Sequence, residues 1–172
     1  MKPDIYWIPG PWVGKLAILG RPRGGDWLTD EVEGWREAGV QVVVSLLSAE
    51  ETRELGLADE AHVVNVNGLN FISFPINDYN VPASEGAARQ LVNDLEEMLA
   101  QGQNVGIHCR AGVGRSSLVA ACLFVDHGED SEISFQRIGT ARGLAVPDTS
   151  AQRQWVSEFA RASHSVRSLT SR

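Results

Sequence analysis

A thiol, an arginine and two glycines share one short stretch of the chain, His108-Cys109-Arg110-Ala111-Gly112-Val113-Gly114-Arg115-Ser116-Ser117. An apolar run at residues 105–107 precedes it and a longer one at residues 118–125 follows, which predicts a buried strand, a tight loop and a buried helix. A loop at a helix N-terminus attracts an anion, because it offers unpaired N–H groups and the positive end of the helix dipole. The two glycines allow the backbone to curl until successive N–H groups converge.

Two side chains of this loop suit the chemistry of a phosphate ester. The guanidinium of Arg115 is a planar fork that can bind two phosphate oxygens. The positive field that holds an anion also stabilises the thiolate of Cys109, and the thiolate is the nucleophilic form. We therefore expect a nucleophile aimed into an anion cradle, and the cradle is formed by Arg110, Ala111, Gly112, Val113, Gly114 and Arg115.

Other phosphate-binding or cysteine-containing loops fit this spacing less well. A Walker loop requires lysine where Arg115 stands, and a dinucleotide-binding fingerprint requires glycine at Ser117. Sulfurtransferases of the rhodanese type use a shorter loop than the five residues that separate Cys109 from Arg115. A simpler alternative is a buried structural cysteine beside a surface arginine. The strand, loop and helix pattern argues against it.

The motif H-C-x5-R-[S/T], complete from His108 to Ser116, resembles the signature of the protein tyrosine phosphatase superfamily. The resemblance implies an α/β fold and a phosphocysteine intermediate, with no metal and no other cofactor. It also implies that Ser116 hydrogen-bonds the cysteine sulfur and helps it to leave when the phosphoenzyme is hydrolysed. A helix cap is the alternative role for Ser116, and both roles can coexist.

A phosphocysteine mechanism needs an acid that protonates the leaving oxygen. In the family this acid is an aspartate on a loop upstream of the cysteine. Asp78 lies 31 residues before Cys109, in a loop bounded by Pro75 and Pro82, which restrict its backbone. We therefore expect Asp78 to be the general acid, and later the base that deprotonates the attacking water. The alternative is an Asx-turn with the two residues that follow Asp78.

A segment near the C-terminus resembles the family's Q-T-x-x-Q water-positioning segment, Val146-Pro147-Asp148-Thr149-Ser150-Ala151-Gln152. Asp148 stands in the place of the first Gln, and Gln152 matches the second. Thr149 and Gln152 also fit a helix-capping box. A water-positioning role for Asp148 and Gln152 and a purely structural role therefore both stay open.

His108 and Cys122 are expected to have structural roles, and the role of a basic loop near the N-terminus stays open. His108 is expected to orient the loop, because neighbouring strand residues face opposite sides, which argues against a Cys–His protease. Cys122 lies in the apolar run and is expected in the core. The basic loop Gly20-Arg21-Pro22-Arg23-Gly24-Gly25-Asp26-Trp27 either borders the pocket or is a plain turn.

Composition limits the class of protein. The chain has 172 residues, of which 43% are hydrophobic, enough for one domain with a core. A net charge of −7 argues against nucleic acid or an anionic membrane as a partner. Two cysteines indicate no disulfide framework, and a catalytic thiolate needs a reducing compartment. The first residues resemble no signal peptide and no run reaches membrane length, so we expect a cytoplasmic protein.

Periodicity and turn residues predict the elements that would position these side chains. Strands are expected at residues 5–8, 16–19, 41–47, 71–74 and 104–107. Helices are expected from 26 or 29 to 39, from a capping box at 48–51 to about 56, and at 58–66, 84–102, 118–125, 131–141 and 149–159. The alternation predicts an α/β fold with a single-domain, mostly parallel central sheet flanked by helices. Residues 1–160 would form the catalytic domain, followed by a polar, frayed tail at 161–172.

The resemblance is strongest to the compact dual-specificity group and its bacterial, kinase-associated phosphatase-like members. Classical tyrosine phosphatases place Trp-Pro before the acid, where this chain has Ile76-Asn77. The predicted reaction is hydrolysis of phosphotyrosine, phosphoserine or phosphothreonine in proteins, or of small phosphomonoesters. The alternatives are a phosphoinositide or inositol-phosphate phosphatase, and a non-catalytic module that binds phosphorylated residues. The joint presence of Cys109, Asp78 and Arg115 argues against the last.

Overall fold

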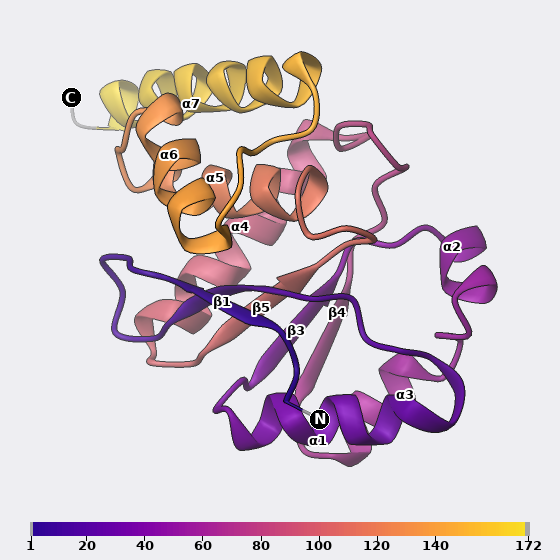
Figure 1. Cartoon of the computed structure of the whole chain (residues 1–172). Helices are drawn as coiled ribbons and strands as arrows, with labels where there is room; N and C mark the ends of the chain where they lie inside the picture. The colour runs from indigo at the N-terminus through magenta and orange to yellow at the C-terminus, as the bar shows by residue number, and fades with distance from the viewer. Residues whose placement is uncertain (1, 171–172) are drawn as a thin grey trace.

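The computed structural model describes residues 2–170, without the side chains of residues 166, 167 and 170. A five-stranded sheet lies at its centre (Figure 1). Its strands are β1 (Ile5–Ile8), β2 (Leu16–Leu19), β3 (Val42–Ser45), β4 (Asn70–Ser73) and β5 (Val105–His108). The strand order is β1-β2-β5-β3-β4, and only the β1–β2 pairing is antiparallel. The mostly parallel α/β sheet expected from the sequence is thereby confirmed.

The three inner strands β2, β5 and β3 are buried on both faces, which is why they are mostly apolar. Leu16 and Ile18 of β2 face one side, where they join the core formed with the C-terminal helices. Ala17 and Leu19 face the other side and pack with the N-terminal helices. β3 consists of three valines and Ser45, all buried, but it is shorter than expected, because Leu46 and Leu47 already belong to the connection that leads to α2.

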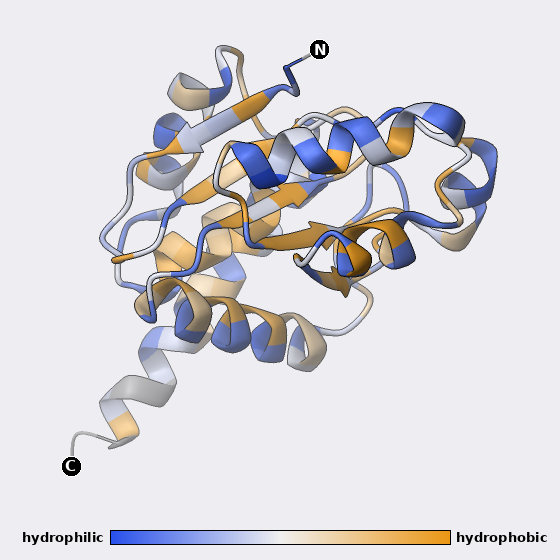
Figure 2. Ribbon diagram, turned by 90° about the horizontal axis from the view of Figure 1, so that it is seen from below, coloured by the Kyte–Doolittle hydropathy of each residue, from blue (hydrophilic) through white to orange (hydrophobic). Residues whose placement is uncertain are grey.

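Helices cover both faces (Figures 1 and 2). On one face lie η1 (Gly25–Trp27), α1 (Leu28–Glu37) and α3 (Glu60–Val66), and α2 (Ala49–Glu54) follows the end of β3. On the other face lie α4 (Glu85–Ala100), α5 (Arg115–Asp126), α6 (Ser131–Arg142) and α7 (Ser150–Thr170). α5 is the central helix of this layer, buried almost throughout and packed against α4, α6 and α7.

The last helix is longer than the sequence predicted. α7 continues past Phe159 as far as Thr170, so the segment expected to be a frayed tail is helical up to that residue. Packing explains the difference, because Ser163 is buried and accepts a 2.7 Å hydrogen bond from Arg89 of α4. Residues 171 and 172 lie outside the described residues. In the part of the chain that is described, no helix is long and apolar enough to span a membrane.

Candidate active site

The loop between β5 and α5 lies at the edge of the sheet where the parallel strands end. Cys109 directly follows β5, and only 2% of its surface is exposed. Gly112 adopts a positive φ of 66°, a conformation that disfavours any residue with a side chain. α5 then begins at Arg115, with Gly114 as its N-cap and no capping side chain. The N-terminus of this buried helix thus opens toward the loop.

Two polar groups surround the sulfur of Cys109. The backbone N–H of Gly112 donates to Sγ at 3.3 Å, and Oγ of Ser116 lies 3.4 Å from Sγ. Each of these groups can donate a hydrogen bond to the sulfur. Ser116 is therefore beside the sulfur, as the resemblance implied, and it is not the helix N-cap.

The guanidinium of Arg115 is fixed by four hydrogen bonds, although only 1% of the residue is exposed. Nη1 and Nη2 donate to the two carboxylate oxygens of Glu51 at 2.7 and 2.9 Å. Nη1 also donates to the Ile76 carbonyl at 2.8 Å, and Nη2 to Oδ1 of Asp78 at 2.9 Å. A guanidinium held in this way keeps a fixed plane next to the loop.

The buried pair of Arg115 and Glu51 stays charged. Burial works to raise the pKa of Glu51, but hydrogen bonds from Arg115 and the Ser48 backbone, with the charge of Arg115, lower it to about 2. Burial works to lower the pKa of Arg115, but its hydrogen bond to Glu51 and the charges of Cys109, Glu51 and Asp78 raise it. Each partner thus stabilises the ionised form of the other.

Glu51 is a site residue that the sequence did not reveal. It completes a capping box at the start of α2, where Ser48 Oγ accepts from the Glu51 N–H and the Glu51 carboxylate accepts from the Ser48 N–H. That local motif accounts for a glutamate at this position. Only the fold brings it against Arg115, 64 residues away in the chain.

Asp78 lies in the loop after β4, beside Arg115. The Asx-turn is not formed, because the Asn80 N–H donates to the Asn77 carbonyl and not to the Asp78 side chain. Asp78 Oδ1 accepts from Arg115 and also from the N–H of Tyr79 at 3.1 Å, while its carbonyl accepts from the side chain of Asn80. Tyr79 has a positive φ of 59°, which is uncommon for a bulky residue. The local turn thus supports a carboxylate that is 41% exposed and adjacent to the cradle.

His108 points away from Cys109. Its Nε2 lies 2.6 Å from Oε1 of Glu60 in α3, and its ring centroid is 6.0 Å from that of Trp35. Nδ1 has no hydrogen-bond partner among the described residues. The divergence of neighbouring side chains expected from the strand is present, and Glu60 is a second partner that the sequence did not indicate, because it lies on another element.

Gln152 lies near the cradle, and its side chain hydrogen-bonds the backbone of two separate segments. Gln152 is buried, and its Oε1 accepts from the N–H groups of Asp148 and Thr149 at 3.1 and 3.2 Å. Thr149 Oγ1 accepts in return from the Gln152 N–H, so the capping box is present. Gln152 Nε2 also donates to the carbonyl of Asn80, two residues after Asp78. The side chain therefore links α7 to the Asp78 loop.

Asp148 lies directly over the cradle. A Cβ on Gly114 would fall 2.3 Å from Oδ2 of Asp148, so a side chain at that position of the loop would force Asp148 to move. Desolvation and then the neighbouring charge of Asp78 raise the pKa of Asp148, against the opposing effects of Arg115 and the Gly114 backbone. Two carboxyl groups thus approach the cradle from separate segments.

The remaining predicted features lie at the rim or in the core. Arg110 is 45% exposed at the side chain, and its Nη1 lies 3.4 Å from Glu54. In the basic loop, Arg23 pairs with Glu31 and stacks on Trp27, so this cation is engaged locally. Cys122 is buried, as predicted, and burial raises the pKa of its thiol. Among the described residues, no group of three potential metal ligands is found.

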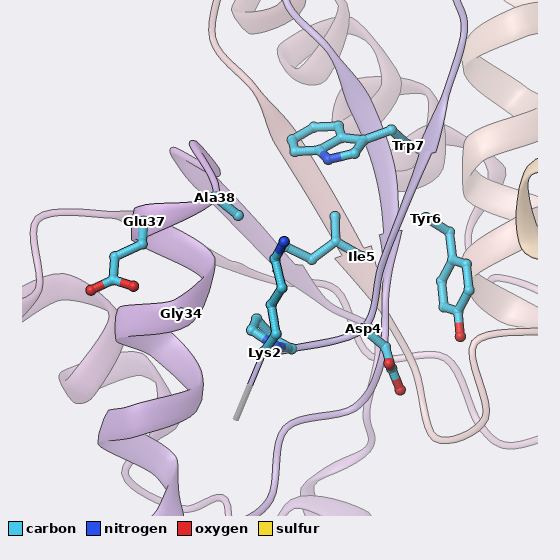
Figure 3. A pocket seen from close by; sticks show the side chains of 9 residues that line it. Lys2, Asp4, Ile5, Tyr6, Trp7, Gly34, Glu37 and Ala38 are labelled. Atoms are coloured by element: carbon cyan, nitrogen blue, oxygen red, sulfur yellow. The ribbon is translucent and has the colours of Figure 1, made fainter.

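A wide surface groove lies elsewhere, between β1 and α1 (Figure 3). Its walls come from the N-terminal segment and from α1, and are formed by Lys2, Pro3, Asp4, Ile5, Tyr6, Trp7, Gly34, Glu37 and Ala38. No residue of the cradle lines it. The groove is therefore distinct from the candidate active site.

Comparisons with known proteins agree with this geometry. Residues 17–129 match the family "Polymorphic toxin system, DSP-PTPase phosphatase". The chain is 29% identical over 154 residues to the putative tyrosine phosphatase 197R of Invertebrate iridescent virus 6, and 24% identical over 131 residues to cyclin-dependent kinase inhibitor 3 of Rattus norvegicus. These alignments cover 88% and 75% of this chain but only 54% and 61% of the relatives, so the chain spans little more than half of their length.

Solved structures show the same fold. Kinase-associated phosphatase with its catalytic cysteine replaced by serine superposes with a TM-score of 0.86 at 19% identity, covering 95% of this chain and 97% of that one. PTPMT1 in complex with PI(5)P gives a TM-score of 0.72 at 20% identity, covering 87% and 94%. The expected fold of cysteine-based phosphatases is thereby confirmed.

Proposed function

The chain belongs to the DSP-PTPase phosphatase family of polymorphic toxin systems, and from this premise we propose that it is a cysteine-dependent phosphomonoester hydrolase of the dual-specificity type. Its substrates are phosphotyrosine, phosphoserine or phosphothreonine in proteins, or small phosphomonoesters. The observation that carries the proposal is the position of Cys109 in the loop that leads into the N-terminus of α5. Its sulfur accepts a hydrogen bond from the Gly112 N–H. Its location in the cytoplasm is part of the proposal, because a catalytic thiolate needs a reducing compartment.

The first step transfers the phosphoryl group to the protein. The Cys109 thiolate attacks phosphorus and forms a sulfur–phosphorus bond, while the bond to the ester oxygen breaks. Asp78 gives its proton to the departing oxygen, which leaves as an alcohol or a phenol. Arg115 and the backbone N–H groups of residues 110–115 hold the equatorial oxygens of the phosphoryl group, where negative charge concentrates.

The second step releases phosphate. Water attacks the phosphocysteine, Asp78 accepts a proton from it, and the sulfur leaves as a thiolate. Ser116, which lies 3.4 Å from Sγ, hydrogen-bonds the departing sulfur. Asp148 and Gln152 are further candidates for positioning the water, because Asp148 lies over the loop and Gln152 anchors the adjacent backbone.

Arg115 has limited capacity for a substrate. Three of its four terminal N–H bonds go to Glu51 and the Ile76 carbonyl, and the fourth goes to Asp78. A phosphate that binds the guanidinium as a fork therefore uses Nε and the Nη2 hydrogen that Asp78 occupies. Entry of the phosphate thus displaces the Asp78 carboxylate from Arg115 and leaves it beside the scissile bond.

Arg110 favours one second candidate function, hydrolysis of a phosphoinositide or an inositol phosphate. Its guanidinium is half-exposed at the rim of the cradle and its ion pair with Glu54 is loose, at 3.4 Å. A surface pair of this kind is worth about 0–1 kcal/mol, so a second phosphate on the substrate could replace Glu54. PTPMT1, one of the structural relatives, was solved with PI(5)P bound.

The test is phosphate release from phosphopeptides, phosphoinositides and inositol phosphates by the purified protein. Cys109→Ser should abolish turnover and retain binding of the phosphate ester, because the cradle remains. Cys122→Ser is the matched control and should keep its activity, since that thiol is buried in α5. Substantial hydrolysis by Cys109→Ser, or none by the unmodified protein with any of the three substrate classes, would refute the proposal.

A further inference from the structure

The outer side of the cradle is held by an arginine from another helix. Arg142, the last residue of α6, donates from Nε to the Gly112 carbonyl at 2.9 Å and from Nη2 to the Ala111 carbonyl at 3.2 Å. Because the N–H groups of such a loop face inward to the anion, its carbonyls face outward. The fork of Arg142 thus binds two neighbouring carbonyls on the side opposite to the phosphate site.

One peptide connects Arg142 with the nucleophile. The carbonyl of Ala111 and the N–H of Gly112 belong to the same peptide group. That N–H donates to Sγ of Cys109 at 3.3 Å, while the carbonyl accepts from Arg142. Hydrogen bonds in a chain polarise one another, so a cation on the carbonyl makes the N–H a stronger donor. The charge of Arg142 therefore acts on the sulfur without touching it.

The N-terminal strand fixes the position of Arg142. The Tyr6 ring lies under the guanidinium, with the Arg142 Cζ 4.2 Å from the ring centroid. The Tyr6 ring points to the side of β1 opposite to Ile5 and Trp7 (Figure 3), and α6 packs against β1. Stacking of a guanidinium on an aromatic face restricts its rotation while leaving its N–H groups free to donate.

We propose that Arg142 is a positioning residue that aims the Ala111–Gly112 peptide at Cys109 and thereby stabilises its thiolate. The inference deepens the proposed function and rests on Cys109 being the nucleophile of that function. Removal of Arg142 should raise the pH at which Cys109 becomes reactive, while Arg115, which is held by Glu51 and the Ile76 carbonyl, stays in place.

Five other charged groups lie around the cradle and come from several elements. They are Arg110 of the cradle, Arg115 of α5, Glu51 of α2, Asp78 of the loop after β4 and Asp148 of the loop before α7. None of them is altered by a substitution at Arg142. A change in the pH dependence of Cys109 in such a variant is therefore attributable to Arg142.

The experiment measures the rate of alkylation of Cys109 by iodoacetamide as a function of pH, with the labelled peptide identified by mass spectrometry. Arg142→Met keeps an unbranched stem over Tyr6 and removes the fork, and its midpoint should rise by about one pH unit. Arg142→Lys keeps the charge but not the fork, and its alkylation midpoint should rise less than that of Arg142→Met. Arg137→Met removes the same charge from α6 at a residue paired with Glu129, and should not shift the midpoint.

Phosphatase activity provides a second readout. The kcat/KM of Arg142→Met should fall about tenfold below the alkylation midpoint and approach that of the unmodified protein above it. Tyr6→Leu removes the aromatic face under Arg142 and should raise the alkylation midpoint by a smaller amount. This variant replaces Arg142→Met in the experiment if Arg142→Met does not fold. A folded Arg142→Met or Tyr6→Leu variant with an unchanged midpoint overturns the inference, even if its activity is lost. A shifted midpoint supports it, even if no phosphate ester proves to be a substrate.

Discussion

Asp78 and Arg115, 37 residues apart in the chain, are joined by a 2.9 Å hydrogen bond from Nη2 to Oδ1. The same nitrogen donates its other hydrogen to Glu51, so the two carboxylates share this nitrogen. Glu51 is buried and Asp78 is half-exposed, so a phosphate that enters the cradle can displace only Asp78. The candidate acid thus occupies part of the phosphate-binding fork until a substrate arrives.

Arg115→Lys should lower kcat/KM by about 100-fold or more, in the range found when a transition-state donor is removed. An ammonium group cannot bridge both oxygens of Glu51 and also present a fork to phosphate. Steady-state kinetics with an aryl phosphate measure the effect. Arg153→Lys, at an exposed ion pair with Glu132, is the control and should retain full activity. Nearly unchanged activity of Arg115→Lys would contradict the proposed phosphate fork.

Glu51→Gln should destabilise the protein by about 3 kcal/mol, because it leaves the buried guanidinium without its counter-charge. It should also lower kcat about 100-fold, since Arg115 loses its orientation. Urea unfolding and steady-state kinetics measure the two effects. Glu54→Gln, three residues later on the exposed side of α2, should change neither by much. Equal effects of the two substitutions would refute the role of Glu51.

The depressed pKa of Glu51 predicts how stability depends on pH. Its pKa is about 2 in the folded protein, below the ordinary 4.5, so its contribution to stability is complete above pH 4.5 and is lost as the pH falls toward 2. The free energy of unfolding should therefore decrease over this range. Glu51→Gln should show a smaller decrease, which urea titrations at a series of pH values can measure. An identical slope in the variant would argue against the buried ion pair.

Asp78→Asn should lose far more kcat on phosphoserine or phosphothreonine peptides than on nitrophenyl phosphate. General acids contribute about 10²–10⁴-fold, and a basic alkoxide needs the proton more than a stabilised phenoxide does. Single-turnover measurements of phosphoenzyme formation give the comparison without interference from the later hydrolysis. Asp94→Asn, on the exposed face of α4, should leave every rate unchanged. An equal loss across all substrates would move the acid role elsewhere, and Asp148 would be tested next.

Asp148→Asn should stabilise the folded protein at neutral pH. The raised pKa of Asp148 means that its ionised form is disfavoured on folding, so the protein loses stability as the pH rises above the ordinary value of 3.8. Asparagine removes this penalty, and the difference from the unmodified protein should vanish below that pH. Phosphate should also bind more tightly to the variant, because one negative charge near the cradle is gone. Calorimetry measures both, and weaker phosphate binding would contradict this electrostatic account.

The sequence by itself determined the loop that forms the cradle and the position of Cys109 in it. The spacing from Cys109 to Arg115, the two glycines between them and the apolar runs on either side are local features, and local features decide the strand, the loop and the helix start. The order of strands and helices also predicted a mostly parallel sheet, because parallel strands require crossover helices. Asp78 was nominated because the family resemblance implies an acid on a loop upstream of the cysteine, and the loop of Asp78 follows a predicted strand.

Only the tertiary structure decided which side chains support the cradle. Glu51 meets Arg115 across 64 residues, Glu60 meets His108 across 48, and Arg142 meets Gly112 across 30. The capping box by itself explains a glutamate at position 51. The sequence therefore held no sign that the same carboxylate also binds Arg115. Which polar groups meet in the interior depends on how strand ends and helix termini converge. That convergence results from burying apolar faces throughout the chain, and a short motif carries no record of it.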